Sequence, residues 1–332
     1  MKSIAMFNNK GGVGKTTLVC NLASYLAYNF GKKVLVIDAD PQCNTSVNVL
    51  PETEFENFYY DKKGFTIYDI LKPIQRGIGY TEKVETYKIE NFEFDFLIGD
   101  PRLSLMEDLL SNDWKDATSG DPRGLRTTLV FSDLLLKCRE YDFVFFDMGP
   151  SLGSLNRSIL LACDYFLTPM SLDIFSILAI ENIGATLESW RTRFNIGITN
   201  SNDPDALEGL NTSFSIKFLG YVTQQYTAKK SQGIRRPVRA FEEILRRVPE
   251  TIEKEIISKV NKDNVLNINN YNLGTIPNLH SLLPLSQSAH KPIFKLSYQD
   301  GVVGAHFAKV DEFKVTINDI AAHLLENTEV LI

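Results

Sequence analysis

A glycine-rich loop, NNKGGVGKTTL at residues 8–18, constrains the fold of this chain more than any other stretch of its sequence. The apolar run SIAMF precedes the loop, and leucines follow it at every fourth position, as on one face of a helix. The loop is therefore predicted to join a buried strand to a helix, which is the context that a phosphate-binding loop requires. Gly11, Gly12 and Gly14 allow successive backbone N–H groups to turn toward an anion, which a Cβ atom would obstruct.

Strand-like segments recur along the chain, and stretches with helical periodicity separate most of them. Such alternation predicts an α/β fold, with a doubly wound, mostly parallel sheet and helices on both of its faces. Each of the four most apolar segments ends in Asp, Gly or Pro, so polar groups are expected at the carboxyl edge of the sheet, where ligands bind. The expected strands are residues 3–7, 33–40, 94–100, 141–149, 164–170 and 216–223.

The length and charge of the chain favour a globular protein with a large core. It has 332 residues, of which 44% are hydrophobic, and its formal net charge is −6. No run approaches the roughly 18 apolar residues of a membrane helix, and the N-terminus leads into the glycine loop instead of a signal-peptide core. A cytoplasmic protein is therefore expected. The four cysteines form no CxxC pair and the four histidines lack metal-site spacing, which argues against zinc or iron–sulfur ligation.

The motifs of this chain are spread over most of its length. They extend from Lys10 to about Phe294, so that one site draws on nearly the whole sequence. A single domain over residues 1–332 is therefore expected rather than two domains. Four polar stretches are expected to be surface insertions in this domain, and they lie near residues 51–63, 111–124, 199–213 and 258–272.

Two lysines determine the type of the glycine-rich loop. Lys15 is expected to neutralise the β and γ phosphates of a nucleotide, and Thr16 to place its hydroxyl on Mg²⁺. The usual GxxxxGK[ST] pattern requires glycine at position 9, where this chain has Asn9 followed by Lys10. The sequence KGGVGKTT resembles the deviant Walker A signature of the ParA/MinD family of dimeric ATPases. The expected nucleotide-binding residues are Lys10, Gly11, Gly12, Val13, Gly14, Lys15, Thr16 and Thr17.

The resemblance implies a P-loop NTPase fold and a homodimer that depends on ATP and Mg²⁺. In this family the early lysine crosses the dimer interface, so Lys10 is expected to supply a second positive charge to the ATP bound by the other subunit. Lys10 and Lys15 are accordingly both expected to be catalytic residues of a nucleotide-sandwich dimer. The alternative interpretation is that Lys10 is a solvated loop charge beside an ordinary nucleotide site.

Acidic residues at the end of the second expected strand match a further family motif. The stretch VLVIDADPQ resembles switch I, in which Asp40 would orient the attacking water, contribute to the metal site and act as a catalytic residue. Asp38 would support it near the phosphates. A carboxylate with a pKa of about 4 is a weak base, so slow and partner-stimulated ATP hydrolysis is expected. In isolation, the same two residues could simply end a strand and open a turn at Pro41.

The stretch YDFVFFDMGPSLG resembles the Walker B and switch II segment of the family. It places Asp147 at the sheet edge, where this residue would hold Mg²⁺ through a water ligand. Gly149 stands where the family has proline. Because proline fixes φ and glycine frees it, a more mobile switch loop is expected. The expected metal-site residues are thus Thr16, Asp40 and Asp147.

A late segment, TIPNLHSLLPLSQSAHKPIF, resembles the family segment whose proline lines the adenine pocket. Pro277 and Asn278 are therefore expected to contact the base. Asn278 stands where the family has arginine, and the following residues are spaced differently. The preference for adenine is accordingly implied by the family and not by these two residues.

The resemblance also implies a function, namely partition or positioning of a DNA or protein cargo. ATP would close the dimer, the dimer would bind a surface, and hydrolysis would release it. The stretch KKSQGIRRPVRAFEEILRR concentrates positive charge in an acidic chain and could contact the phosphates of nonspecific DNA. A solvated helix face with Glu242 and Glu243 as charge partners is the other interpretation. The DNA-binding candidates are Lys229, Lys230, Arg235, Arg236 and Arg239.

Membrane docking, as in the MinD branch, is a competing output of the same switch. The C-terminal stretch TINDIAAHLLENTEVLI carries acids and no lysine or arginine, which would repel anionic lipid and disfavours a membrane partner. A helix-turn-helix extension before the loop is absent from the sequence, so operator binding is not expected. A ParB-like or other stimulating partner protein and a cytoplasmic, nucleoid-associated location are implied instead.

Two further classes of protein share this loop or this fold. A metabolic P-loop enzyme of the dethiobiotin synthetase type would have the same architecture, but the sequence identifies no pocket for its small-molecule substrate. The nitrogenase iron protein and related metal-cluster carriers need cysteines just beyond switch II, where Cys163 stands alone. The ATP-dependent dimerising switch is therefore the preferred interpretation.

Overall fold

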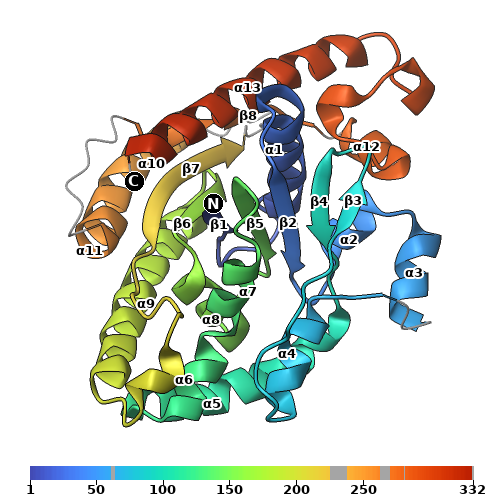
Figure 1. The fold of residues 1–332 in the computed structure, drawn as a ribbon. Helices are drawn as coiled ribbons and strands as arrows, with labels where there is room; N and C mark the ends of the chain where they lie inside the picture. Colours follow the sequence, from blue (N-terminus) through green and yellow to red (C-terminus); the bar gives the residue numbers. More distant parts are fainter. Residues whose placement is uncertain (61–63, 225–237, 262–269, 280, 331–332) are drawn as a thin grey trace.

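The computed structural model describes residues 1–60, 64–224, 238–261, 270–279 and 281–330, and these fold as α-helices around a central β-sheet (Figure 1). Within the described residues the sheet has eight strands in the order β3-β4-β2-β5-β1-β6-β7-β8. Neighbouring strands are parallel, except that β3 runs antiparallel to β4. The strands are β1 (Lys2–Met6), β2 (Val34–Ala39), β3 (Tyr87–Ile89), β4 (Phe94–Leu97), β5 (Phe143–Met148), β6 (Tyr165–Ser171), β7 (Lys217–Gln224) and β8 (Asn272–Ile276).

The six strands expected from the sequence are all present, and the predicted doubly wound, mostly parallel sheet is confirmed. The sequence did not reveal β3 and β8, which form the two edges of the sheet. β3 has only three residues, and β8 contains Asn272 and Gly274, two residue types that strands usually lack. Edge strands are packed and paired on fewer sides, so their apolar pattern is weaker than that of central strands.

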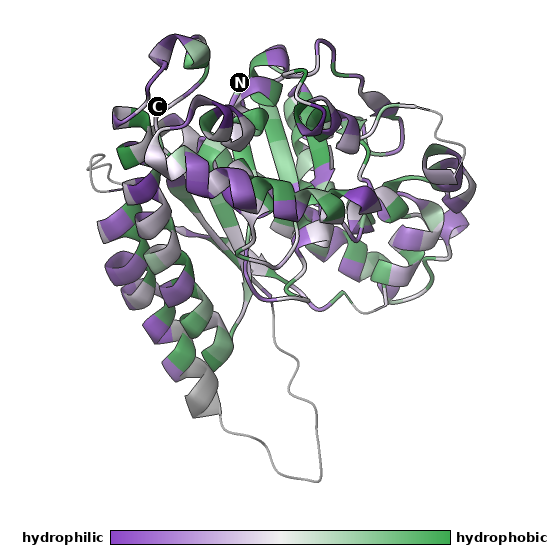
Figure 2. Cartoon of the chain, turned by 90° about the horizontal axis from the view of Figure 1, so that it is seen from below, coloured by the Kyte–Doolittle hydropathy of each residue, from purple (hydrophilic) through white to green (hydrophobic). Residues whose placement is uncertain are grey.

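Alternate residues of each central strand face opposite sides of the sheet and build two cores. In β1, Ile4 and Met6 join one apolar cluster, whereas Ala5 joins the other. Figure 2 shows the mostly hydrophobic strands enclosed by helices whose outer surfaces are more hydrophilic. A sheet covered on both faces in this way requires strands that are buried throughout, as β2 and β5 are.

Helices cover both faces. One face carries α1 (Lys15–Phe30), α2 (Asn44–Val49), α12 (Leu283–Ala289) and α13 (His306–Val330), together with the 3₁₀ turns Ile293–Lys295 and Tyr298–Asp300. The other face carries α4 (Tyr68–Gln75), α5 (Glu107–Ser119), α6 (Pro122–Thr128), α7 (Val130–Lys137), α8 (Ser154–Ala162) and the 3₁₀ turn Pro101–Met106. Later in the chain, the same face carries α9 (Ile174–Thr199), the 3₁₀ turn Pro204–Leu207, α10 (Val238–Ile252), the π-helical turn Glu253–Ile257 and α11 (Ser258–Val260). In Figure 1, α3 (Glu52–Tyr60) stands out from the body of the molecule beside α2.

The stretches expected as surface insertions differ in structure. Residues 51–63 contain α3, whose every residue is at least partly exposed. Residues 111–124 lie mostly in α5 and α6, where Trp114 and Ala117 pack into the core from successive turns of α5. Residues 199–213 are mostly exposed around a 3₁₀ turn, and most of 258–272 lies outside the described residues.

The carboxyl ends of the parallel strands bring distant parts of the chain to one edge of the sheet. The glycine-rich loop follows β1, and Asp40 follows β2. Asp38 of β2 lies opposite Asp147 of β5 in the strand register. Pro277 follows β8 at the same edge. Among the described residues, no helix is both long and apolar enough to cross a membrane.

Candidate functional site

The glycine-rich loop is held in a turn that only glycine adopts easily. Gly12 and Gly14 have φ values of 71° and 78°, and Gly14 is the residue immediately before α1. The Asn8 side chain fixes the loop at its base, since it donates to the Pro169 carbonyl of β6 at 2.8 Å and accepts from the Lys10 N–H at 2.9 Å. The loop therefore presents its backbone N–H groups at the positive N-terminal end of α1, as an anion site requires.

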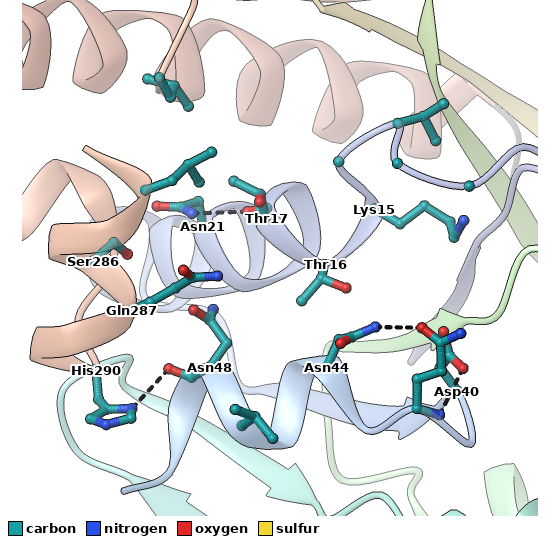
Figure 3. Close-up of a pocket in the computed structure, with 18 of the residues that line it drawn as sticks. Lys15, Thr16, Thr17, Asn21, Asp40, Asn44, Asn48, Ser286, Gln287 and His290 are labelled. Carbon is teal, nitrogen blue, oxygen red and sulfur yellow. Dashed lines mark hydrogen bonds between the residues drawn. The ribbon is translucent and has the colours of Figure 1, made fainter. Parts of the chain in front are cut away.

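Lys15 begins α1 and is only 8% exposed. Its Nζ donates to the carbonyl oxygens of Asn8 at 3.3 Å and Lys10 at 3.4 Å, so the ammonium lies beneath the loop (Figure 3). Burial lowers the pKa of Lys15, and the nearby carboxylates of Asp147 and Asp40 act in the opposite direction. These acids favour the charged form, which is the form that can neutralise a phosphate.

Asp147 lies at the carboxyl end of β5 and is fully buried. Its Oδ2 accepts hydrogen bonds from the hydroxyls of Thr16 at 2.7 Å and Thr45 at 2.6 Å. Its Oδ1 is buried and has no hydrogen-bond partner among the described residues. Burial raises the pKa of Asp147, and the two threonine hydroxyls and the Lys15 charge partly oppose this rise.

This arrangement fits Mg²⁺ bound in the manner usual for nucleotide sites. Mg²⁺ is held there by one or two protein oxygens, by phosphates and by water, and not by a protein cage. The described residues contain no group of three or more His, Cys, Asp or Glu side chains that could hold a metal. The Thr16 hydroxyl would bind the ion directly, and the unpartnered Oδ1 of Asp147 would accept from one of its water ligands.

Asp38 is buried next to Asp147 and accepts hydrogen bonds from both the backbone and the side chain of Ser46. Its Oδ2 accepts from the Ser46 N–H at 2.8 Å and the Ser46 hydroxyl at 2.7 Å. Burial and the neighbouring Asp147 charge raise the pKa of Asp38 to about 8. Asp38 thus anchors the start of α2 to the end of β2, and does not line the pocket itself.

Asp40 lines the pocket and is packed against the loop that follows β5. A Cβ atom at Gly149 would lie 3.3 Å from its Oδ1, so glycine at this position leaves room for the Asp40 carboxylate. The same loop is tied down by Asn156, whose Nδ2 donates to the carbonyls of Gly149 at 2.8 Å and Ser151 at 2.7 Å. These hydrogen bonds restrict the loop after β5, which Gly149 was expected to make more mobile.

A pocket of about 1620 Å³ joins these groups and extends well beyond the loop. Most of the expected nucleotide-binding residues line it, from Gly11 to Thr17, and so do Pro277 and Asn278. Its other end is built by polar side chains of α1, α2 and α12, which the sequence analysis missed (Figure 3). They form no motif in the sequence, and they include Asn21, Asn48, Ser286, Gln287 and His290, whereas Asn44 of α2 lies nearer to Asp40.

Lys10 does not line this pocket. Its side chain turns the other way, toward the start of α9, where its Nζ forms an ion pair with Asp173 of the same chain. Four of the DNA-binding candidates, Lys229, Lys230, Arg235 and Arg236, lie outside the described residues. Arg239 lies at the start of α10, but its side chain is also outside the described part of the structure.

The sequence of this chain is similar to those of characterised protein families. The AAA_31 family model, described as an AAA domain, matches residues 1–200. The virulence plasmid ParA family protein pGP5-D of Chlamydia psittaci is 32% identical over 186 residues, which cover 55% of this chain and 62% of that protein. The chromosome-partitioning ATPase Soj of Thermus thermophilus is 30% identical over 195 residues, covering 59% and 65%. The chain thus spans less than two thirds of the length of these two relatives.

Solved structures share the fold over a larger part of the chain. Protein DIP2308 from Corynebacterium diphtheriae superposes with a TM-score of 0.75 at 28% identity, and the alignment covers 99% of both chains. Cobyrinic acid a,c-diamide synthase from Mycobacterium smegmatis, solved with bound ADP and magnesium, has a TM-score of 0.51 at 20% identity and covers 75% of this chain and 82% of the other. The second similarity concerns the fold alone.

Proposed function

Since this chain belongs to the AAA_31 family of ParA/Soj-type P-loop ATPases, we propose that it is an ATP-dependent dimerising switch for partition or positioning of a cargo. The observation that carries the proposal is that Lys15, Thr16 and Asp40 line one pocket. Asp147 adjoins them, because it accepts a hydrogen bond from the Thr16 hydroxyl and its charge acts on Lys15. These residues come from the glycine loop and from the ends of two adjacent strands. Together they offer a positive charge, a metal-binding hydroxyl and two buried carboxylates, of which that of Asp40 lines the pocket.

Each residue has a distinct task in this proposal. The loop N–H groups and Lys15 bind the β and γ phosphates, Thr16 and Asp147 hold Mg²⁺, and Asp40 orients the attacking water. Mg²⁺ held by Thr16 and Asp147 would supply positive charge against the phosphates during transfer. Because Asp40 positions water more than it removes a proton, turnover is slow until a partner protein completes the site.

Lys10 makes the active species a homodimer in this proposal. Its ammonium is directed away from its own pocket, so it cannot neutralise the nucleotide held beside Lys15 of the same chain. In the dimer it reaches the nucleotide of the other subunit. Nucleotide state then controls association, and hydrolysis separates the two subunits.

The surface on which the dimer acts is proposed to be nonspecific DNA in the cytoplasm, over the nucleoid. The support is the basic composition of residues 229–247 in an otherwise acidic chain. Partition relatives such as Soj are consistent with a DNA-associated cargo. A single domain comprising residues 1–332 performs these steps, and a ParB-like partner stimulates hydrolysis.

Analytical sedimentation with Mg²⁺-ATP or ADP, with and without duplex DNA, tests this function at two salt concentrations. An ATP-dependent dimer that sediments with DNA and leaves it at higher salt is the expected result, because phosphate contacts release counterions. A dimer that ignores DNA would keep the ATPase switch and exclude the nucleoid surface. A nucleotide-bound monomer under all conditions would contradict the switch, and would favour a metabolic P-loop enzyme with the same fold.

A further inference from the structure

Lys10 is held within its own subunit by the start of α9. Its Nζ pairs with the Asp173 carboxylate, lies 3.5 Å from the Ser171 hydroxyl and stands 5.9 Å from the centre of the Phe175 ring. Ser171 ends β6, and Asp173 and Phe175 follow it, at the same edge of the sheet as the nucleotide pocket. The side chains of Lys10 and Asp173 are 27% and 38% exposed, so the pair lies at the protein surface.

The two oxygens of Asp173 have different partners. Oδ1 accepts from the Ser176 N–H at 3.0 Å and caps the N-terminus of α9, whereas Oδ2 pairs with Lys10. Asparagine caps helices about as well as aspartate but carries no charge. Asp173→Asn therefore removes the ion pair and keeps the cap, which separates the electrostatic role of this residue from its structural one.

Three large apolar side chains are exposed next to this pair. Ile174, Phe175 and Leu178 are 45%, 65% and 47% exposed, and they occupy the first two turns of α9. A single exposed apolar residue is ordinary on a protein surface, but a contiguous group beside a functional loop indicates a contact surface. Lys10 connects the exposed apolar residues to the glycine-rich loop, because its ammonium lies near the Phe175 ring and its backbone is part of the loop.

We propose that the start of α9 is a contact surface for a second copy of this chain, and that Asp173 is a positioning residue that holds Lys10 until this copy docks. The inference rests on the proposed function, in which Lys10 reaches the nucleotide of the other subunit. A second copy placed to receive Lys10 must approach the edge where Ile174, Phe175 and Leu178 are exposed. The occupant of this patch is therefore the partner subunit.

The charges explain how such a contact responds to nucleotide. One ammonium cannot neutralise both a carboxylate of its own subunit and a phosphate of the other, so the two contacts compete for Lys10. ATP presents more negative charge than Asp173 and can draw Lys10 across the interface. Without ATP the pair with Asp173 is retained, and it opposes association of empty subunits.

The first experiment measures the dissociation constant of the dimer by sedimentation in saturating Mg²⁺-ATP. Asp173→Asn is expected to tighten the dimer by about two- to fivefold, the size of a partly exposed ion pair. Asp173→Glu, which retains the charge, is expected to return the dissociation constant toward that of the unmodified chain. Lys10→Ala is expected to lose the ATP-dependent dimer, and adding Asp173→Asn in that background should not restore it, because the residue that Asp173 holds is gone.

The second experiment tests the apolar patch on the same helix. Phe175→Ser is expected to weaken the dimer by about tenfold, as for a central aromatic residue of an interface. Ile196→Ser is the matched control, because Ile196 is 49% exposed at the far end of α9. It is expected to leave the dimer unchanged. Thermal unfolding of each variant verifies that the fold is intact.

The outcomes separate this inference from the function on which it rests. If the unmodified chain binds ATP but never dimerises, the proposed switch itself is wrong. If it dimerises and Asp173→Asn leaves the dimer unchanged or weakens it, the holding role of Asp173 is excluded. If Phe175→Ser and Ile196→Ser have equal effects, the start of α9 is not the contact surface.

Discussion

The two ends of the nucleotide pocket are built in different ways. At the phosphate end, the charged groups come from the loop after β1 and from the ends of β2 and β5, and Lys15 and Asp147 are buried with several hydrogen bonds or charges around them. At the other end, the walls come from α2, α3, α12 and the segment after β8, and α3 is exposed along its whole length.

This difference shows where chemistry is fixed by the fold and where it is free to vary. A group at the end of a buried parallel strand cannot move without disturbing the sheet, so its position is set to within the tolerance that phosphate chemistry requires. Residues on short peripheral helices are held by few contacts. The phosphate end should therefore tolerate almost no substitution, and the far end should respond with small changes in affinity.

The largest effect is expected from Lys15→Ala. It should lower the affinity for Mg²⁺-ATP by about 100-fold or more, because the phosphates lose a buried charged donor. Isothermal titration calorimetry measures this change. Lys10→Ala is the matched control, since it removes the same charge from the same loop but outside the pocket. It should keep the affinity for Mg²⁺-ATP within about threefold and lose the ATP-dependent dimer. An equal loss of affinity in both variants would contradict the assignment of Lys15 alone to the nucleotide of its own subunit.

A loss confined to turnover is expected from Asp147→Asn. The amide oxygen can still accept from Thr16 and Thr45, but the neutral group holds the water shell of Mg²⁺ poorly, so hydrolysis should fall by about 100-fold. Phosphate release measured over a Mg²⁺ titration tests this. Thr45→Val removes one hydrogen bond to the same oxygen and keeps the carboxylate, so it should cause a loss of less than about tenfold. A larger loss of turnover in Thr45→Val than in Asp147→Asn would contradict this assignment, because the Thr45 hydroxyl would then matter more than the Asp147 charge.

The phosphate end was also the part that the sequence predicted best. Glycines at fixed spacing and acids at the ends of apolar runs are local signals, and they single out Lys15 and Asp40, which line the pocket, and Asp147, which the Thr16 hydroxyl contacts. The sheet was predictable for the same reason, since the six central strands carry strong apolar patterns. The edge strands β3 and β8, which are short and polar, carry no such pattern.

What could not be predicted depends on contacts between distant residues. The partner of Lys10 lies 163 residues further along the chain, and no spacing in the sequence connects them. The polar residues of α2 and α12 approach one another only because both helices pack beside α1, as the contact of His290 Nδ1 with the Asn48 carbonyl at 3.1 Å shows. The composition of residues 111–124 is polar and suggests a surface stretch, and only the packing of α5 shows that Trp114 and Ala117 contribute to the core.

Gly149→Ala is expected to have an intermediate effect, because it acts on Asp40 through packing. The added Cβ would lie 3.3 Å from the Asp40 Oδ1, so the carboxylate must shift by a few tenths of an ångström. Turnover should fall by about fivefold with an unchanged affinity for ATP, since positioning of water is sensitive to small displacements. Single-turnover kinetics separates the two quantities. Ser151→Ala, an exposed position in the same loop, is the control, and an equal loss there would indicate a general effect on the loop.

The smallest effect is expected at the far end of the pocket, from Asn278→Ala. If the adenine lies between Pro277 and Asn278, removal of the amide should weaken ATP binding by about threefold and leave GTP binding unaffected, because a hydrogen bond to the base is lost and the phosphates stay in place. Gln287→Ala on α12 is the matched variant, since it removes an amide from the other wall of the same pocket. Competition binding with the two nucleotides measures both. A loss of ATP preference in Gln287→Ala alone would place the base against α12, and equal losses of ATP and GTP in Asn278→Ala would exclude a base contact at that position. Either result would show that the far end of this pocket departs from the family pattern while its phosphate end follows it.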